Sequence, residues 1–525
     1  MSTAAIQPRP AVNPWVIAGT VMLATFMEVL DTSVANVALP HIAGSLSASI
    51  DESTWVLTSY LVSNAIILPM GAWFSMLIGR KRFYMICVAL FTLSSLACGV
   101  APSLFMLILF RVLQGVGGGA LQPISQAILM ENFPREKQGM AAAVYGMGVL
   151  VAPIIGPTLG GWITDNFSWR WIFLINIPVG LLSLTLTSVL IFDPPYLKRR
   201  SLRDGLRIDY AGLGLLTLGL GALEIVLDEG ERNDWFSSNL IVGFAVVSAV
   251  CLISVVFWEL HHPHPVIELR MLKDRNLAVA TLSMFLLGIT LYSSTVLLPL
   301  FLQTLMGYTA TLAGLAVSPG GIATLVAMPL VGTLLKKYEP RWLVLFGVTF
   351  CCLGLIRMSN FTLDIDFATS VRARVTQSLG FAFLFVPINT AVFAFIPKER
   401  MNYATGLLNL ARNIGGSSGI AAATTLVARR AQYHQSVLIA HLTPLDATYQ
   451  AALQTASQTL VVRGASAADA ATQAQALLYG QVQRQAGMLA FADAFRVFAI
   501  LFTVVIPLMF LMKKIGPRRG PAVIE

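Results

Sequence analysis

The stretch GVLVAPIIGPTLGG, residues 148–161, decides the fold of this chain, because it combines evenly spaced small residues with two prolines in an apolar segment. Small residues recur at intervals of one helical turn, at Gly148, Ala152, Gly156 and Gly160. This spacing lets two membrane helices approach until their backbones are in contact. Pro153 and Pro157 each remove a backbone N–H and free a carbonyl, which bends a helix. The stretch therefore predicts a bent membrane helix that packs closely on a second one.

The composition of the whole chain also predicts a membrane protein. Of its 525 residues, 56% are hydrophobic and 12% are charged, whereas about 25% of the residues of a soluble domain are charged. Apolar stretches of about 20 residues recur along the chain, and each is long enough to cross about 30 Å of hydrocarbon as a helix. We predict fourteen such spans, among them single helices over residues 104–130, 403–427 and 491–512.

Three further segments extend the pattern: LDTSVANVALP (residues 30–40), RVLQGVGGG (111–119) and WRWIFLINIP (169–178). Together with residues 148–161, they resemble the fourteen-helix drug:proton antiporters of the EmrB/QacA type, within the major facilitator superfamily, over essentially the whole chain. The resemblance implies an all-α membrane protein with the major facilitator superfamily fold, in which fourteen transmembrane helices form two six-helix bundles plus two additional helices. It also assigns seven residues to the antiporter motif: Gly148, Ala152, Pro153, Gly156, Pro157, Gly160 and Gly161.

An internal repeat supports two related bundles. Arg111, Gln114 and Gly117 recur 263 residues later as Arg374, Gln377 and Gly380. A constant offset indicates duplicated bundles in the same orientation. We predict three domains, which are an N-terminal bundle over residues 1–193, two inserted helices over 194–272 and a C-terminal bundle over 273–525. The inserted helices are expected to pack beside the bundles, and Gly156 is expected to face a helix of the opposite half.

Positively charged side chains gather in alternate connections between the predicted spans, and such connections face the cytoplasm. This set includes Arg80 to Arg82, the basic residues over 198–207 and those over 513–519. The pattern predicts both termini in the cytoplasm, and the resemblance places this multi-pass protein in a bacterial inner membrane. The first apolar span is too long for the core of a signal peptide, so we expect no cleaved leader.

Glu28 and Asp31 are three residues apart on the first predicted helix and therefore share a face. Two carboxylates this close in a medium of low dielectric constant do not both ionise easily, so that one of them is suited to bind and release a proton. Asp31 occupies the acidic position of the first-helix motif of the resembled family. Arg111 is the expected counter-charge, because a guanidinium inside a membrane must meet a carboxylate or carbonyls. We predict that these three residues couple transport to protons. The alternative for the two carboxylates is a fixed charge partner or a water-facing lining residue, and the alternative for Arg111 is a structural tie between the first and fourth helices.

The stretch GAWFSMLIGRKR, residues 71–82, resembles the superfamily's signature between the second and third helices. It predicts a cytoplasmic gating loop with six marked residues: Gly71, Ser75, Gly79, Arg80, Lys81 and Arg82. Ser75 stands where the family usually has Asp. A serine is able to cap a helix N-terminus, but it cannot form the charge pair that locks the outward-facing state. Alternatively, the basic residues only set the orientation in the membrane.

Further polar residues of the predicted spans are candidates for a central substrate cavity: Gln114, Asn36, Asn64, Gln122, Tyr292, Asn389, Asn409 and Arg412. Met27, Phe285, Phe381 and Phe385 would add an adaptable apolar lining suited to lipophilic cargo. For each residue the alternative is packing or a hydrogen bond between helices. Glu224, one turn before Asp228, is a weaker candidate whose side chain alternatively extends to the membrane surface.

Motifs for enzymes and cofactors are scarce. The chain contains no G-x-x-x-x-G-K-[ST] sequence, so we do not expect it to hydrolyse ATP. The HHPHP stretch over residues 261–265 has three histidines without a fourth ligand or a shielding fold, which argues against a metal site. We therefore predict no enzymatic activity, no cofactor and no metal, and the proton gradient as the energy source.

The segment over residues 429–490 is too long for an ordinary connection and, by the topology above, lies in the periplasm. Helix-start signals over 443–446 and 466–469 predict two helices. Each carries an apolar stripe, the first of Tyr449, Ala452, Leu453, Ala456 and Leu460 and the second of Ala470, Ala474, Leu477, Leu478 and Val482. The stripes form either a self-packed hairpin or a docking surface. The resemblance implies docking of a periplasmic adaptor, a membrane fusion protein of the EmrA type, and through it an outer-membrane channel of the TolC type.

These observations predict proton-driven efflux of lipophilic toxic compounds by the inner-membrane component of a tripartite pump. The expected partners are lipophilic small molecules, protons and membrane lipids, and no nucleic acid. Within the same fold, the alternative is a dedicated exporter of one metabolite, such as a fatty acid or a siderophore. A non-transporting membrane scaffold or sensor is the alternative of another class. Such a protein does not require charged side chains inside the membrane, as Asp31, Glu28 and Arg111 are predicted to be.

Overall fold

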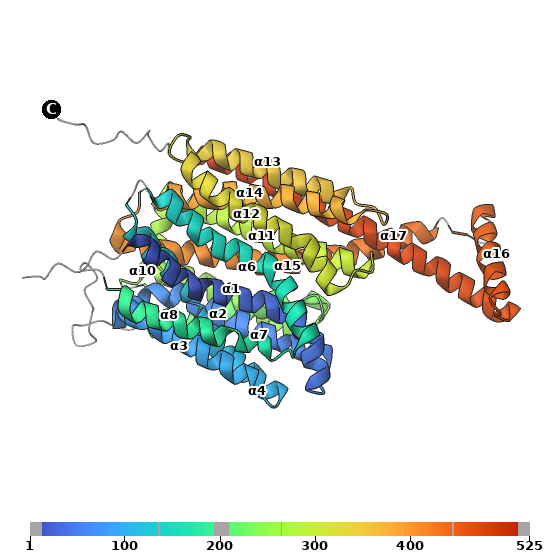
Figure 1. Ribbon diagram of the computed structural model, residues 1–525, viewed down its shortest axis with the longest axis horizontal. Coiled ribbons are helices and arrows are strands. Elements are labelled where there is room, and N and C mark those ends of the chain that lie inside the picture. Colours follow the sequence, from blue (N-terminus) through green and yellow to red (C-terminus); the bar gives the residue numbers. More distant parts are fainter. Residues whose placement is uncertain are drawn as a thin grey trace, which may run out of the picture.

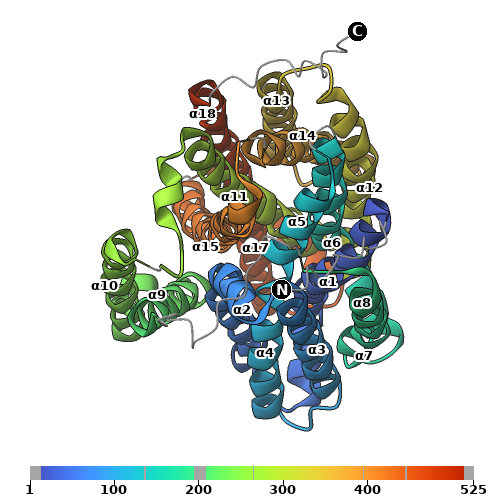
Figure 2. The ribbon, with the colours of Figure 1, turned by 90° about the vertical axis from the view of Figure 1, so that its left-hand side faces the viewer.

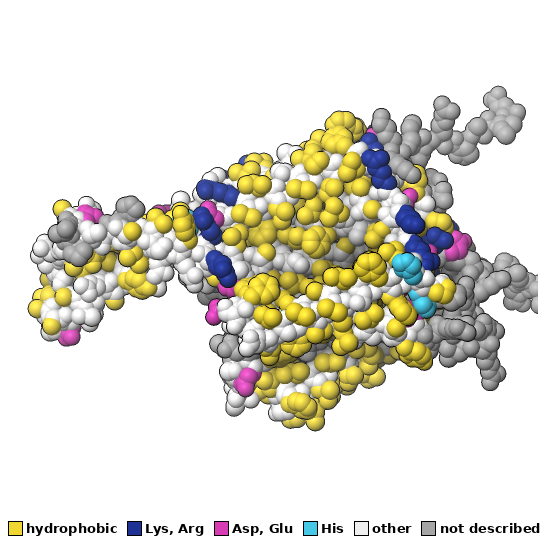
Figure 3. All heavy atoms as spheres, turned by 180° about the vertical axis from the view of Figure 1, so that it is seen from behind, with side chains coloured by type: hydrophobic (Ala, Val, Ile, Leu, Met, Phe, Trp, Pro, Cys, Tyr) yellow, Lys and Arg dark blue, Asp and Glu magenta, His cyan; other side chains and the backbone are white. Residues whose placement is uncertain are grey.

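The computed structural model describes residues 13–134, 137–193, 209–263, 265–393, 395–440, 442–443 and 446–512, and every regular element in them is a helix. The helices lie side by side in one elongated bundle, from one end of which α16 and part of α17 project (Figure 1). On the face drawn in Figure 3, a broad hydrophobic zone separates two zones of charged side chains. The basic residues over 198–207, over 513–519 and in the N-terminal segment, which we expect to face the cytoplasm, lie outside the described residues.

The N-terminal half, residues 13–193, contains these helices: α1 (Pro14–Ser45), α2 (Ile50–Ile78), α3 (Arg80–Gly99), α4 (Leu104–Gly118), α5 (Leu121–Asn132), α6 (Gln138–Asn166), α7 (Trp171–Leu174) and α8 (Asn176–Leu190). α9 (Tyr210–Glu229) and α10 (Asn239–His261) follow. The C-terminal half, residues 265–512, contains α11 (Arg275–Thr304), α12 (Ala310–Leu334), α13 (Pro340–Ser359), α14 (Phe367–Phe393), α15 (Met401–Ala440), α16 (Ala447–Val462), α17 (Ala467–Thr503) and α18 (Val505–Leu511).

Thirteen segments of the described residues are long and apolar enough to cross a membrane, one fewer than the fourteen predicted. The missing segment is 403–427, which lies in α15 and includes Asn409, Arg412, Asn413 and several Gly, Ser and Thr residues. Asn409 and Arg412 are buried within the bundle. These two polar residues make α15 less apolar than the other spans, but their side chains face protein and not lipid. The all-helical membrane fold is confirmed, whereas the count of fourteen spans is not.

The span predicted over residues 104–130 consists of two helices. α4 ends at Gly118 and α5 begins at Leu121. At Gly119, a Cβ atom would lie 2.5 Å from the backbone oxygen of Asn64 in α2. The glycine therefore lets α2 pack directly against the chain at the break. This break separates the polar residues of α4 from those of α5, which belong to different hydrogen-bond networks.

The two halves use the same pairing of helices. α1 packs along α6 in the N-terminal half, and α11 packs along α15 in the C-terminal half. Between the halves, α6 packs along α12, from Gly139 beside Leu335 at one end to Thr158 beside Gly314 towards the other. The view along the bundle shows the two groups of helices meeting at α5, α6, α12 and α15 (Figure 2). The exact domain boundaries stay a prediction.

α9 and α10 pack on each other at one side of the bundle (Figure 2), as expected for inserted helices. α9 also touches both halves, because Thr58 of α2 donates a hydrogen bond to Asp228 and α9 packs on α15. In the following turn, Trp235 donates to Thr425 of α15 at 3.0 Å. Glu224 is 3% exposed, so its side chain does not extend to the surface.

The described residues of the segment 429–490 are mainly helical, and two of its helices, α15 and α17, continue into the bundle. α15 extends to Ala440, and α17 runs unbroken from Ala467 into the last predicted span, 491–512. α16 packs on α17, and Ala470 and Ala474 of the second predicted stripe are buried. Ala470 and Ala474 thus pack against protein, whereas Leu477 of the same stripe stays exposed and α16 has no buried residue.

Of the two helix starts predicted in the segment 429–490, one is confirmed and the other is wrong. Ser466 caps α17 as predicted, since its hydroxyl accepts from the backbone N–H of Asp469 at 3.2 Å. α16 is capped by Asp446, whose carboxylate accepts from the N–H of Thr448, so the predicted start at Thr443 is wrong by three residues. Pro444 and Leu445 lie outside the described residues.

Candidate functional site

Asp31 of α1 lies at the centre of a buried cluster of polar side chains. Its carboxylate is 2.5 Å from the guanidinium of Arg111 on α4, and both side chains are at most 1% exposed. Gln114 donates to the same carboxylate at 3.0 Å, and Asn176 of α8 donates at 2.7 Å. The structure thus brings Asp31, Arg111 and Gln114 together and adds Asn176. Removing one partner of a buried ion pair costs about 3–5 kcal/mol, because the other charge stays uncompensated.

Glu28 lies one turn away on α1 but belongs to a separate network. Its carboxylate accepts hydrogen bonds from Tyr60 and Asn64 of α2, at 3.1 and 3.0 Å, and from Gln122 of α5 at 2.6 Å. Tyr60 joins the two networks, because its ring lies 4.2 Å from the guanidinium carbon of Arg111. The two carboxylates therefore differ in kind: a cation balances Asp31, and neutral donors surround Glu28.

Gln122 connects Glu28 to the C-terminal half. Its amide nitrogen donates to Glu28, and its amide oxygen accepts from the guanidinium of Arg412 on α15. Arg412 is 1% exposed. A chain of three side chains thus runs from a carboxylate in one half to a guanidinium in the other.

Gln126, one turn after Gln122 on α5, forms a second polar contact between the halves. Its amide donates to Asn389 of α14 at 2.6 Å and accepts from Asn409 of α15 at 2.7 Å. Tyr145 of α6 donates to Asn409 at 3.0 Å. Gln126 and Asn389 are 263 residues apart, which is the repeat distance. They are equivalent positions that meet where the halves face each other.

Among the residues predicted for the cavity, Asn36 is the exception, since it is exposed on α1 and lies outside these networks. The others are buried or half-buried. Among them, Gln122 and Arg412 are hydrogen-bonded to each other, whereas Asn389 and Asn409 are both hydrogen-bonded to Gln126. Tyr60, Asn176 and Gln126 are not among the predicted site residues. The repeat could have identified Gln126, because it is the equivalent of Asn389. Tyr60 and Asn176 carry no such signal.

The stripe of small residues packs on α1 of its own half, so the expectation that Gly156 faces the opposite half is wrong. A Cβ atom on Gly156 would lie 2.4 Å from Ser33, and one on Gly160 would lie 2.9 Å from Val34, both on α1. α6 meets the opposite half through another face, where Thr158 is hydrogen-bonded to Ser318 of α12 at 2.8 Å. Spacing of small residues predicts a close contact, but it contains no information about the partner helix.

The two prolines of this helix have a structural consequence that the sequence predicts. The backbone oxygen of Pro153 lacks its helical donor, because Pro157, four residues on, has no N–H. Ser33 of α1 donates to this oxygen at 3.0 Å. The freed carbonyl is therefore satisfied by the helix that the small residues allow to approach.

The stretch over residues 71–82 is not an extended loop. α2 continues to Ile78, and Gly79 alone, with φ 91°, separates it from α3. This positive φ favours glycine, which has no Cβ atom. Ser75 is buried inside α2 and donates to the backbone oxygen of Gly71 at 2.7 Å. A capping role for Ser75 is thus wrong, because no helix begins there.

The basic residues after Gly79 differ in their surroundings. Arg80 forms an ion pair with Glu131 of α5 and lies 3.1 Å from the side-chain amide of Asn402 on α15. Lys81 donates to the backbone oxygen of Ser188 at 2.6 Å. Arg82 is exposed. Arg80 is therefore paired with a carboxylate of its own half, other than the Asp of the family pattern, and reaches the other half at Asn402.

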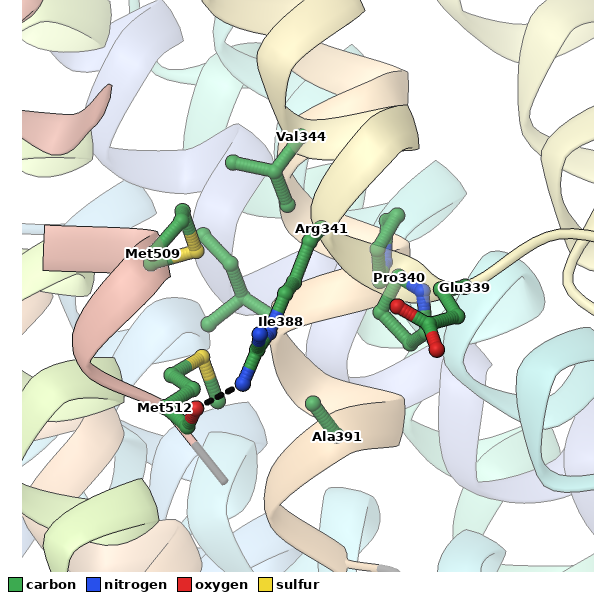
Figure 4. A pocket seen from close by; sticks show the side chains of 9 residues that line it. Glu339, Pro340, Arg341, Val344, Ile388, Ala391, Met509 and Met512 are labelled. Carbon is green, nitrogen blue, oxygen red and sulfur yellow. Dashed lines mark hydrogen bonds between the residues drawn. The ribbon is translucent and has the colours of Figure 1, made fainter. Parts of the chain in front are cut away.

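The predicted apolar lining is tightly packed. Met27, Phe381 and Phe385 are at most 2% exposed, and the Phe385 ring stacks on Tyr145 with centroids 5.9 Å apart. The pocket in Figure 4 lies elsewhere, between α13, α14 and α18, and Arg341 reaches across it to the backbone oxygen of Met512. Its volume of about 10 Å³ is far below the roughly 300 Å³ of a small drug-binding site.

A larger cavity, of about 620 Å³, lies outside the bundle between α15, α16 and α17. Leu438, Tyr449 and Leu478 contribute apolar surface to it, and Gln481 and Arg484 contribute polar groups. Its size matches a drug-sized molecule. No group of three or more His, Cys, Asp or Glu side chains in the described residues is arranged to hold a metal ion.

Comparisons with known proteins agree with this architecture. A family model described as Major Facilitator Superfamily matches residues 21–420. Multidrug export protein EmrB of Haemophilus influenzae is 41% identical over 425 residues, which are 81% of this chain and 82% of that protein. Fatty acid resistance protein FarB of Neisseria gonorrhoeae is 36% identical over 94% of each chain.

Solved structures support the fold alone. The proton:xylose symporter XylE matches with a TM-score of 0.61 and 14% sequence identity, over 95% of this chain and 96% of that chain. The human organic anion transporter MFSD10 matches with a TM-score of 0.59 and 12% identity, over 96% of this chain and all of that chain.

Proposed function

This chain belongs to the major facilitator superfamily, and from this premise we propose that it exports lipophilic toxic compounds across the bacterial inner membrane in exchange for protons. Similarity to EmrB over four fifths of the chain supports multidrug efflux. The observation that carries the proton coupling is the Asp31 cluster, buried inside a bundle of membrane-spanning helices. Ionisable side chains at such depth are costly and mark proton or substrate pathways.

The geometry supports a route from proton binding to movement of the halves. Protonation of Asp31 removes the negative charge that holds Arg111. Tyr60 contacts both Arg111 and Glu28, so a shift of the guanidinium reaches the second carboxylate. Glu28 is joined through Gln122 to Arg412 of the other half. Weakening this contact favours separation of the halves and access to the central residues, in the rocking motion of such transporters.

Asp31→Asn tests the proposed coupling. The amide cannot release a proton, so we expect the purified protein to lose substrate-induced proton release. Asn also leaves Arg111 without its counter-charge, which lowers stability. The double variant Asp31→Asn/Arg111→Gln removes that unpaired charge and separates the loss of coupling from the loss of stability. Full proton release by Asp31→Asn would move the carrier role to Glu28 or to another residue.

A dedicated exporter of one metabolite, such as a fatty acid or a siderophore, is the second candidate. The similarity to FarB, whose name refers to fatty acid resistance, supports it over 94% of the chain. Expression in an efflux-deficient host, challenged with lipophilic compounds of several classes and with long-chain fatty acids, distinguishes the two. Protection against one class alone would favour the dedicated exporter, and protection against several classes would favour multidrug efflux.

We further propose that this protein is the inner-membrane part of a tripartite pump with both termini in the cytoplasm. The projection of α16 and part of α17 beyond the bundle supports a role for this segment in docking a periplasmic adaptor (Figure 1). Its buried alanines face inward. The docking surface is therefore proposed on the outward residues of the hairpin, which include Val461, Val462 and Tyr479. The adaptor in turn would contact an outer-membrane channel.

A further inference from the structure

The C-terminal half contains a copy of the Asp31 cluster that lacks the carboxylate. Arg374 and Gln377 of α14 repeat Arg111 and Gln114 of α4. In both halves the arginine donates to the glutamine oxygen, at 2.9 Å in the first and 3.0 Å in the second. At the repeat distance from Asp31, the chain has Ser294 of α11, and Arg374 donates to its hydroxyl at 3.1 Å. The contact between arginine and glutamine is thus retained, while the carboxylate is absent.

Arg374 therefore carries a positive charge without a counter-charge. It is 0% exposed. Its acceptors are the side-chain oxygens of Ser294, Thr295 and Gln377, which are all neutral. Among the described residues no carboxylate forms an ion pair with it, and Cys351 is the ionisable side chain beside it. Burial of an unpaired charge is expensive, and a guanidinium in a protein stays protonated.

Hydrogen-bond donors without acceptors surround this charge. The Nε of Arg374, the amide nitrogen of Gln377 and the hydroxyl of Ser378 are buried and have no hydrogen-bond partner. These residues lie at positions i, i+3 and i+4 of α14, and therefore on one face. In the N-terminal half, the amide nitrogen of Gln114 donates to the Asp31 carboxylate. The orphaned amide nitrogen of Gln377 marks the place where the equivalent acceptor is missing.

We propose that this cluster, made of Ser294, Arg374, Gln377 and Ser378, binds a small monovalent anion of halide size in place of the missing carboxylate. Such an anion would balance the charge of Arg374 and accept from the orphaned donors. Gly320 of α12 limits its size, because even a Cβ atom there would lie 2.5 Å from the Ser378 hydroxyl and 3.0 Å from Cγ of Arg374. The close packing of α12 on this cluster leaves no room for lipophilic cargo.

Thermal unfolding of the purified full-length protein in uncharged detergent tests the proposal independently of transport. The protein is heated in sodium chloride, sodium bromide, sodium formate or sodium gluconate at equal ionic strength. We expect the melting temperature to rise by several degrees in chloride and bromide relative to gluconate, and to saturate with concentration, because a ligand that binds only the folded state stabilises it. A similar rise in formate would support the site and extend its chemistry to small carboxylates.

Variants assign the effect to this cluster. Ser294→Asp introduces the carboxylate that Asp31 supplies in the other half, so its melting temperature should not depend on the anion. Ser294→Asn, the matched neutral variant, should keep the dependence. Arg374→Gln removes the cation and should abolish the dependence of the melting temperature on the anion. This variant tests the proposal even if Ser294→Asp does not fold. Asp31→Ser removes the carboxylate from the N-terminal cluster, so the melting temperature of this variant should depend on the anion more strongly than that of the unmodified protein.

Two results would overturn the proposal. Equal melting temperatures of the unmodified protein in chloride and gluconate would mean that water alone satisfies the orphaned donors. An equal rise in the unmodified protein, in Ser294→Asp and in Arg374→Gln would mean that the anion acts on other parts of the surface.

Discussion

At the residue scale, Gln122 is the side chain that connects Glu28 of one half with Arg412 of the other. One end of its amide donates to Glu28 and the other accepts from Arg412. An amide is suited to this position because it is both donor and acceptor. It links an anion and a cation that belong to different halves without forming an ion pair with either. Glu28 and Arg412 are thereby held in contact through a neutral group.

Gln122→Leu should lower both stability and transport. Leucine offers no hydrogen bond, so the Glu28 carboxylate and the Arg412 guanidinium each lose a buried partner, at a cost of about 1–3 kcal/mol for each unsatisfied group. A lower melting temperature in detergent and slower antiport in proteoliposomes are the measurements. Asn132→Leu on the same helix is the control, because among the described residues the side chain of Asn132 donates to Ile128 of its own helix and to no residue of the other half. Equal effects of the two variants would contradict a special role for Gln122.

How far the site is predictable from sequence depends on the kind of signal each residue carries. Asp31 and Arg111 are predictable as a pair, because charges inside a membrane must be matched, and they form an ion pair. Asn176 and Tyr60 are neutral, lie on other helices and have no fixed spacing from Asp31. Their contacts depend on how the helices are packed, and one sequence does not contain that information.

At the element scale, α6 shows which parts of a fold follow from local pattern. The spacing of its small residues correctly predicts a close helix contact, and its prolines correctly predict a freed carbonyl. The partner, α1, is set by the order of helices around the bundle. In the same way, the length and apolarity of a helix identify most spans but not α15, because α15 contains polar residues that are buried against other helices of the bundle.

Gly156→Ala should destabilise the protein, whereas Gly161→Ala should not. A methyl group at position 156 would lie 2.4 Å from Ser33, and at position 161 its nearest neighbour would be 3.8 Å away. Overpacking of this kind costs about 1–3 kcal/mol, while an unhindered Gly to Ala change in a helix gains up to about 1 kcal/mol. Thermal unfolding in detergent measures both variants. If the two melted alike, the close approach of α6 to α1 at Gly156 would be refuted.

At the scale of the whole molecule, the projecting hairpin is mechanically continuous with the bundle. α15 and α17 each run from the bundle into the projection, and Arg430 of α15 is 2.5 Å from Asp493 of α17. Removal of all residues from 429 to 490 would therefore cut two helices of the bundle as well. A sharper variant leaves both helices and changes only what joins them.

Replacement of residues 441–466 by a short Gly/Ser linker removes α16 while α15 and α17 keep their full length. We expect antiport in proteoliposomes to persist, because none of the residues of the Asp31 and Glu28 networks is among those replaced. Resistance of cells and co-purification with the periplasmic adaptor should be lost. Adaptor binding at the normal level by this variant would refute docking through α16.

The contact of Gln126 with Asn389 has a consequence for how such a molecule arises from duplication. In a symmetric dimer of identical chains, a residue that lies on the two-fold axis meets the same residue of the other chain. Two carboxylates or two ammonium groups would repel there, whereas two amides attract, because each offers a donor and an acceptor. The pair of Gln126 and Asn389 is thus of the kind that a self-associating ancestor of half the length would require at its interface.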